Sequence, residues 1–328
     1  MCQACRTSRF CFWRSEAFTI LEMLVSTVIV CILIFMMVSL VSQTSAIWQR
    51  SSDTVEAFQS ARLAYEVITR NLSQATLNTY LDYDNEEAPS HYLRASDLAF
   101  VSGSCGTAGL PGTPGTGQAI FFQALLGSTG NTTSLGGLDG LLNSCGYFVS
   151  YTTNVSIPAH VSSRDKTYRY RLMQLMVPAE SNTIYRANQS STAWYSGFTN
   201  STYPVADNVI ALVIRPLDPA KSPGDILTNT YSYDSRRDAT AIPQPATANQ
   251  LPPVVEVTMI AIEESAAKRL ETGGQEPTVI SDALSGKFQS PSAFQTDLGN
   301  LEKALNENRI PYRIFSSAVP IRESKWTK

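Results

Sequence analysis

Charged side chains are scarce in this chain of 328 residues: Asp, Glu, Lys and Arg together make up 16% of it, and the formal net charge is −3. Proteins that bind the phosphate backbone of nucleic acids depend on clustered positive charge, and the chain has no extended run of Lys and Arg. Nucleic acid is therefore not an expected partner. Apolar residues reach 43%, which is enough for an ordinary core and argues against disorder throughout.

Histidine and catalytic motifs are also scarce. The two histidines, His91 and His160, lie in polar, loop-like surroundings, so we interpret both as surface residues. The patterns H-E-x-x-H and G-x-S-x-G and the dinucleotide-binding fingerprint are absent, and the glycine-rich segment 103–117 lacks the G-K-S/T ending of a phosphate-binding loop. We expect no enzymatic activity and no cofactor. An enzyme remains an alternative, which a pocket of convergent polar side chains would support.

One long hydrophobic run is present, and it lies near the N-terminus, from Phe18 to Val41. At about 1.5 Å per residue it is long enough to cross a bilayer as a helix. A single carboxylate, Glu22, interrupts it. Because a charged residue inside a membrane costs about 2.5–3.5 kcal/mol on insertion scales, such a residue is by default functional.

Basic residues are found before this run and not directly after it. Arg6, Arg9 and Arg14 precede the run, and the next basic residue is Arg50. The positive-inside rule then keeps the N-terminus in the cytoplasm and the remaining chain outside the inner membrane. An ordinary signal peptide has an apolar core of about 7–15 residues followed by a small-residue cleavage site, which does not fit here. An uncleaved signal anchor remains the alternative.

Residues 17–24, Ala-Phe-Thr-Ile-Leu-Glu-Met-Leu, resemble the class III signal of type IV prepilins and type II secretion pseudopilins. The resemblance implies that prepilin peptidase cleaves between Ala17 and Phe18 and that the new amine of Phe18 is methylated. It also implies that Glu22 pairs with the N-terminal amine of a neighbouring subunit during assembly. Ala17 stands where the family usually has glycine, so we expect slower cleavage.

The six cysteines fall into three groups. Three lie in the leader that such cleavage removes: Cys2, Cys5 and Cys11. A zinc site there is disfavoured because no histidine follows the C-x-x-C pair. Cys31 lies within the apolar run, as a small hydrophobe. Cys105 and Cys145 lie in the exported part, where oxidation is permitted. We predict a disulfide between them, closing a loop of about 40 residues. No metal site is expected.

The helix is predicted to continue beyond the apolar run, to about Asn78. One face carries apolar residues at alternating steps of three and four, namely Phe58, Ala61, Tyr65, Ile68, Leu72 and Ala75. Charged residues at spacings of four, Arg62, Glu66 and Arg70, support the other face in water. The stripe spans fewer than four heptads, so packing on the protein's own sheet is favoured over a coiled coil.

After residue 80 the pattern changes to short strands separated by loops. We predict strands over 97–102, 118–126, 145–152, 167–177, 208–215, 254–262 and 312–318, with insertions at about 103–117 and 218–250 and a surface helix over 292–308. Segment 81–90 is interpreted as a solvated turn. A calcium loop starting at Asp82 is the alternative, but Glu87 stands where an EF-hand needs glycine.

The outer part carries a second resemblance. Segments 207–217 and 251–270 resemble the sheet core of J-type minor pseudopilins, and 312–326, with the overall length, resembles the Verru_Chthon cassette protein C family. The resemblance implies an α+β, pilin-like fold in which a long N-terminal helix packs on an antiparallel β-sheet. The expected organisation is a leader (1–17), a membrane and assembly half of the helix (18–41), an amphipathic half (42–80) and a β-rich extracytoplasmic head (81–328).

The function implied is that of a minor pilin or pseudopilin, a structural subunit of an envelope filament. Its expected partners are prepilin peptidase, other pilin-like subunits and the bacterial inner membrane. The alternative is a membrane-anchored binding or adhesion module that does not assemble. For such a module Trp194 and Tyr195 are candidates for an exposed aromatic contact, with core packing as the competing interpretation.

Overall fold

The computed structural model describes residues 19–107, 109–153, 167–186, 192–218 and 226–326. The chain divides into two units, Met1–Asp53 and Thr54–Lys328, and each is described separately. The leader and the cleavage positions Ala17 and Phe18 lie outside the described residues.

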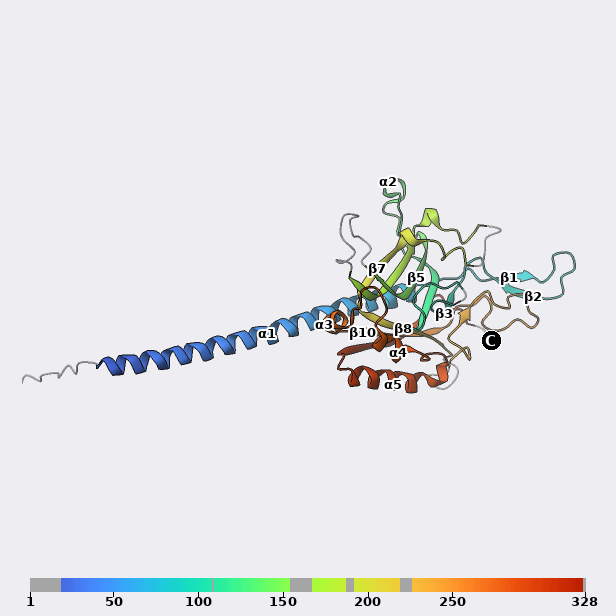
Figure 1. The fold of residues 1–328 in the computed structure, drawn as a ribbon. Coiled ribbons are helices and arrows are strands. Elements are labelled where there is room, and N and C mark those ends of the chain that lie inside the picture. The colour runs from blue at the N-terminus through green and yellow to red at the C-terminus, as the bar shows by residue number, and fades with distance from the viewer. Residues whose placement is uncertain (1–18, 108, 154–166, 187–191, 219–225, 327–328) are drawn as a thin grey trace, which may run out of the picture. The chain divides into compact units, whose positions relative to one another are not determined.

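Helix α1 (Ile20–Ser73) contains the hydrophobic run from Ile20 onward (Figure 1). Its part from Ile20 to Ser45 is long and apolar enough to cross a membrane, and the large apolar side chains of that part are exposed. The helix ends five residues before the predicted Asn78. There the N–H of Thr76 bonds to the carbonyl of Gln123, 2.8 Å away, so the chain joins a strand instead of continuing the helix.

The second half of α1 packs on the protein's own sheets, as its sequence pattern predicts. Ala61, Ile68 and Leu72 are fully buried in the main core. The hydroxyl of Tyr65 donates to the carbonyl of Val257 at 2.9 Å. These contacts account for the apolar stripe without a second helix.

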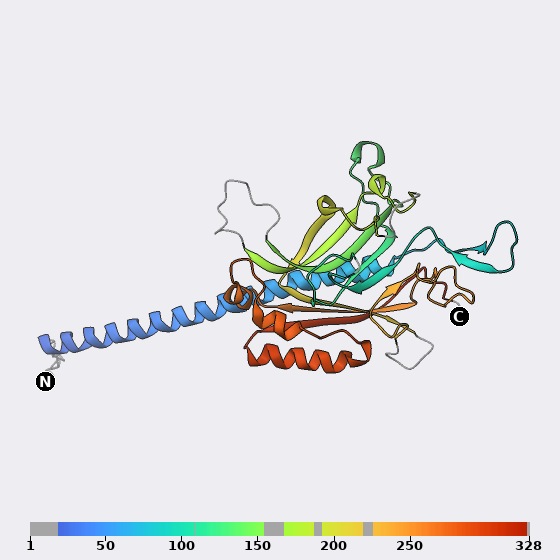
Figure 2. The same cartoon turned by 45° about the vertical axis from the view of Figure 1, so that its right-hand side comes forward.

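A six-stranded antiparallel sheet forms the larger part of the head, in the order β7-β6-β5-β4-β3-β9 (Figure 2). Its strands are β3 (Val101–Ser104), β4 (Gln118–Leu125), β5 (Leu142–Thr153), β6 (Tyr168–Val177), β7 (Thr202–Asp207) and β9 (Tyr233–Asp234). Short helical turns join some of them: α2 (Thr132–Leu135), η2 (Ala179–Ser181) and η3 (Thr199–Ser201). The central strands match the predicted ones within a few residues, whereas β7 and β9 were not predicted.

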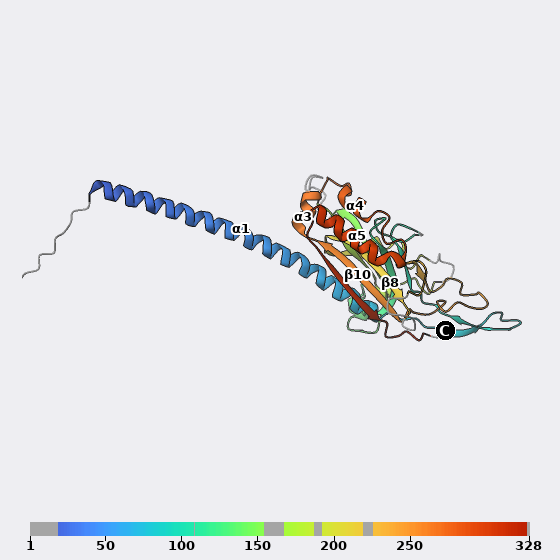
Figure 3. The same cartoon turned by 90° about the horizontal axis from the view of Figure 1, so that it is seen from below.

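A second antiparallel sheet has three strands in the order β11-β10-β8. Its strands are β8 (Val209–Leu217), β10 (Val254–Ile262) and β11 (Tyr312–Pro320). Helices α3 (Glu264–Leu270), α4 (Thr278–Leu284) and α5 (Phe294–Glu307), with the turn η4 (Pro291–Ala293), follow β10 in the chain, and α4 and α5 lie along this sheet in Figure 3. The predicted 254–262 strand is confirmed with its bounds.

Each face of the six-stranded sheet carries a buried core. The main core lies between this sheet, the second half of α1 and the three-stranded sheet, and Phe122 belongs to it. A smaller core lies on the opposite face, where Phe121 packs under the segments around Leu110 and Trp194. Neighbouring residues of one strand point to opposite faces, so successive side chains of β4 belong in turn to the main core and to the smaller core.

The segment interpreted as a solvated turn, 81–90, lies within a hairpin of β1 (Tyr80–Tyr83) and β2 (Tyr92–Ala95). The turn interpretation was therefore wrong for residues 81–83, which belong to β1, and holds for residues 84–90. There the carboxylate of Asp84 accepts from the backbone N–H groups of Asn85 (3.0 Å), Ser90 (2.8 Å) and His91 (3.1 Å). The side chain of Asp84 thus stabilises the turn by bonding to backbone groups at both of its ends.

Candidate functional site

Glu22 is the third residue of α1. The Oγ1 of Thr19 accepts from the Glu22 N–H at 3.3 Å, and the Thr19 carbonyl accepts from the same N–H at 3.0 Å. Thr19 and Glu22 thus have the spacing of a capping box, in which a glutamate or glutamine at this position suits the helix N-terminus. Local helix chemistry therefore offers an explanation for Glu22 that competes with assembly.

The carboxylate of Glu22 has no partner within the described residues. Other polar side chains of the apolar segment bond to its own backbone: Ser26 Oγ donates to the Met23 carbonyl and Thr27 Oγ1 to the Leu24 carbonyl, both at 2.9 Å. Glu22 differs from them because it bears a charge and is surrounded by exposed apolar side chains such as Leu21. In an apolar medium an isolated charged carboxylate is costly, so such a group is either neutralised by a proton or paired with a cation.

The predicted disulfide between Cys105 and Cys145 is absent, and both thiols are free. Cys145, on β5, faces the main core, while Cys105, directly after β3, packs in the smaller core. The six-stranded sheet separates the two side chains, which is the physical reason that they do not bond. Burial raises the pKa of Cys105 to about 11 and that of Cys145 to about 12.

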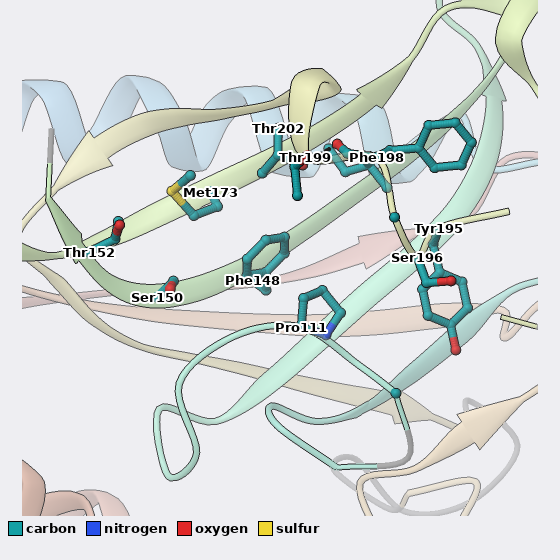
Figure 4. A pocket seen from close by; sticks show the side chains of 13 residues that line it. Pro111, Phe148, Ser150, Thr152, Met173, Tyr195, Ser196, Phe198, Thr199 and Thr202 are labelled. Atoms are coloured by element: carbon teal, nitrogen blue, oxygen red, sulfur yellow. Dashed lines mark hydrogen bonds between the residues drawn. The ribbon is translucent and has the colours of Figure 1, made fainter. Parts of the chain in front are cut away.

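A half-open cavity of about 430 Å³ lies on the outer face of the six-stranded sheet (Figure 4). Phe148 and Met173 form its floor, and Pro111, Tyr195 and Phe198 stand around it. Five residues with hydroxyl side chains also line it: Ser150, Thr152, Ser196, Thr199 and Thr202. Among the described residues that line the cavity there is no acid, no basic side chain and no thiol, so this lining suits an uncharged, largely apolar group.

The aromatic contact suggested for Trp194 and Tyr195 was wrong, and the competing core interpretation is confirmed. Trp194 is 2% exposed and Tyr195 is 6% exposed. The Tyr195 ring stacks on Phe121 with 4.6 Å between centroids, and burial raises the pKa of Tyr195. One edge of Tyr195 still reaches the cavity.

A buried ionic cluster at the start of β6 was missed by sequence reasoning. Alternation along β6 predicts that Arg169 and Arg171 face solvent, yet the two residues are 3% and 4% exposed. Arg169 pairs with Glu271 and, at 3.5 Å, with Glu264, while Arg171 pairs with Asp207 at 2.7 Å. No sequence signal identified these partners, because they lie far along the chain.

The contacts of this ionic cluster indicate a role in stabilising the fold. Burial acts to raise the pKa of Glu271, but the hydrogen bond from Arg169 lowers it, and the net shift is downward. Three buried polar atoms nearby have no hydrogen-bond partner in the part of the chain that the structure describes: Tyr151 Oη, Arg169 Nε and Asn208 Oδ1. Their residues line one cavity of about 10 Å³, which is the space of about one water molecule.

The acidic hairpin turn shows no metal-binding arrangement. Hydrogen bonds from Ser90 and from the backbone of His91 lower the pKa of Asp84, so its carboxylate is committed to the turn. Among the described residues, no group of three or more His, Cys, Asp and Glu side chains is placed to hold a metal ion. His91 is exposed beside Asp84, whereas His160 lies outside the described residues.

Comparison of the chain with models of protein families, with curated proteins and with solved structures found no match.

Proposed function

We propose that this protein is a prepilin-like minor subunit, a structural component of a type IV pilus-like or type II secretion-like filament. The observation that carries the proposal is that the carboxylate of Glu22 has no partner within the described residues, although it lies in a helix segment otherwise suited to a membrane. The segment's resemblance to a class III signal adds support. Prepilin peptidase, other pilin-like subunits and the inner membrane are its proposed partners.

In the proposed mechanism, peptidase cleavage before Phe18 creates an amine four residues from Glu22. That amine on one subunit pairs with the Glu22 carboxylate of its neighbour. Opposite charges attract more strongly in an apolar surrounding than in water, so the pair forms as apolar helix segments gather. Subunits then leave the bilayer as a bundle, with neither charge isolated.

The head supports a minor or terminal position. Around its sheets it carries the hairpin of β1 and β2, the segment over the outer face near Leu110 and Trp194, and the long connection from β8 to β10. Such additions pack poorly in a shaft of repeated copies. A subunit present in few copies avoids that restriction.

Three variants separate assembly from helix capping. Glu22→Ala removes both roles, Glu22→Gln keeps a side chain compatible with a capping box but removes the charge, and Thr19→Ala removes the capping oxygen but keeps the charge. If the carboxylate pairs with an amine, incorporation into filaments falls in both Glu22 variants and persists in Thr19→Ala. All three still insert in the membrane. Normal incorporation of Glu22→Gln contradicts the pairing.

Intact-mass measurement of the chain recovered from membranes tests processing directly. A chain that begins at methylated Phe18 supports the proposal. A chain that still begins at Met1, in cells with an active prepilin peptidase, contradicts it.

An anchored binding module is the second candidate, and the uncharged cavity beside Phe148 favours it. In that case the head acts without assembly. The chain then keeps its leader, and replacement of Glu22 leaves its distribution in the envelope unchanged.

A further inference from the structure

The outer edge of β11 carries unpaired backbone groups. β11 pairs with β10 on one side only. At its two ends, the Glu263 N–H donates to the Pro311 carbonyl (3.0 Å) and the Ile321 N–H donates to the Pro253 carbonyl (3.1 Å). Backbone groups of alternate residues in an antiparallel ladder point to the same side. The odd-numbered residues of β11 therefore bond to β10, and the even-numbered residues face outward.

Four N–H groups thus point away from the sheet, those of Tyr312, Ile314, Ser316 and Ala318. None of them donates a hydrogen bond to another described residue. The next outward position is Pro320, which has no N–H and ends the row. Ser316 and Ala318 are exposed, so the edge is accessible at its middle.

The other edges of the two sheets are closed. On β8, the Leu212 N–H donates to the Thr116 carbonyl (2.9 Å) and the Ile214 N–H donates to Gln118 Oε1 (3.0 Å). On β7, Pro204 lies within the strand and the register with β6 shifts beside it. β9 is only two residues long. Proline, irregular register and short length are the usual protections of an edge strand.

β11 lacks these protections between residues 312 and 318. Its register with β10 runs without a shift over the whole strand. Its one charged residue, Arg313, lies over the ring of Phe58, with 5.5 Å from the guanidinium carbon to the centroid. Ser316, Ser317 and Ala318 are small, so an added strand can approach the backbone closely. A long, regular and nearly uncharged edge is a template for another strand.

We propose that the outer edge of β11 is a docking site for an extended, uncharged strand of another polypeptide. This strand adds to the three-stranded sheet through backbone hydrogen bonds to residues 312–318. In β-strand addition the main chain supplies most of the affinity, which agrees with a row of free N–H groups flanked by small side chains.

A second copy of this chain is a poorer partner. β11 runs in the same direction as the α1 segment it contacts, because Phe58 meets Arg313 and Tyr65 meets Ser317. Antiparallel pairing of two β11 edges therefore points these helix segments in opposite directions, which does not suit two chains that enter one membrane. This choice of partner rests on the anchoring in the proposed function, whereas the open edge does not.

The full chain in lipid nanodiscs can be tested with a defined peptide probe. The probe is a fluorescent heptapeptide of alternating threonine and valine, N-methylated along one edge so that it does not stack on itself. A peptide N-methylated along both edges is the negative control. We expect the first peptide alone to bind and to slow hydrogen exchange at residues 312–318.

Proline variants locate the binding to the edge. Ser316→Pro and Ala318→Pro each remove one outward N–H without removing a bond to β10, and we expect at least tenfold weaker binding. Ser316→Ala and Ala318→Ser keep the N–H and should bind like the unmodified chain. Thermal unfolding of each variant checks the fold, and if one proline variant is destabilised the other decides.

Three results overturn the inference. They are no binding of the probe to the unmodified chain, equal binding by a stably folded proline variant, or sedimentation as a dimer that the proline variants abolish. The last result assigns the edge to a second copy. Peptide binding does not depend on processing or on Glu22. If the peptide does not bind, the proposed function is therefore not contradicted. If processing or the role of Glu22 is disproved, the open edge of β11 is not contradicted.

Discussion

The hydroxyl groups of Tyr65 on α1 and Ser317 on β11 lie 2.8 Å apart, although 252 residues separate them in the chain. The Tyr65 hydroxyl also donates to the Val257 carbonyl on β10. One side chain of the helix therefore bonds to two neighbouring strands at once. Its burial raises the pKa of Tyr65, so it remains a neutral donor at physiological pH.

Tyr65→Phe should lower the free energy of unfolding of the full chain by about 1 kcal/mol, because a buried carbonyl and a hydroxyl each lose a partner. Chemical unfolding in detergent measures this. Tyr83→Phe is the matched control, since Tyr83 is 50% exposed on the hairpin, and it should leave the midpoint unchanged. Equal effects of both changes would show that the Tyr65 bonds contribute nothing specific.

Arg169→Met should destabilise the chain by about 2–3 kcal/mol. Removal of one partner from a buried pair costs about 3–5 kcal/mol, and the cost is lower here because Glu264 and Glu271 remain partly exposed. Arg62→Met is the control. Arg62 and Glu66 form an exposed pair on α1, and its loss should change stability by less than about 0.5 kcal/mol.

Stability should fall in acid partly through Glu271. A carboxyl whose pKa is lowered by folding contributes stability above its unfolded pKa, about 4.3. That contribution is lost as the pH falls through the lower folded value. Urea unfolding between pH 7 and pH 3 should therefore show a smaller dependence on pH in Glu271→Gln than in the unmodified chain. Identical pH profiles would contradict the lowered pKa.

The thiols of Cys105 and Cys145 should resist alkylation at pH 8 in the folded chain. Both are buried, and their raised pKa values leave little thiolate, the reactive form. Iodoacetamide should label both cysteines only after the chain is denatured, and no reducing agent should be needed. Intact-mass measurement counts the labels. If denatured chains need reduction first, the two residues are disulfide-bonded.

A crystal structure should contain one buried water beside Tyr151, Arg169 and Asn208. Buried polar atoms nearly always have partners, and these three residues line a cavity of suitable size. Tyr151→Phe removes the hydroxyl group that should bond to this water. The electron density of the water should therefore be weaker in that variant. An empty cavity in well-ordered density would contradict the expectation.

Sequence alone determined the features that depend on local spacing. The apolar run around Glu22, the stripe from Phe58 to Ala75 and the strand Val254–Ile262 all follow from residues close together in the chain. The spacing of apolar residues that is typical of a helix or a strand can be recognised within one segment of the chain. The coarse α+β architecture, with an apolar N-terminal helix and antiparallel sheets, could therefore be predicted.

Only the tertiary structure decided what depends on distant partners. It buried Arg169 because Glu271 lies opposite, and it placed Cys105 and Cys145 on opposite faces of one sheet. It also formed the cavity beside Phe148 and left the edge of β11 open. The physical reason is that alternation places a side chain on one face or the other of a strand, but what covers that face depends on how the whole chain packs.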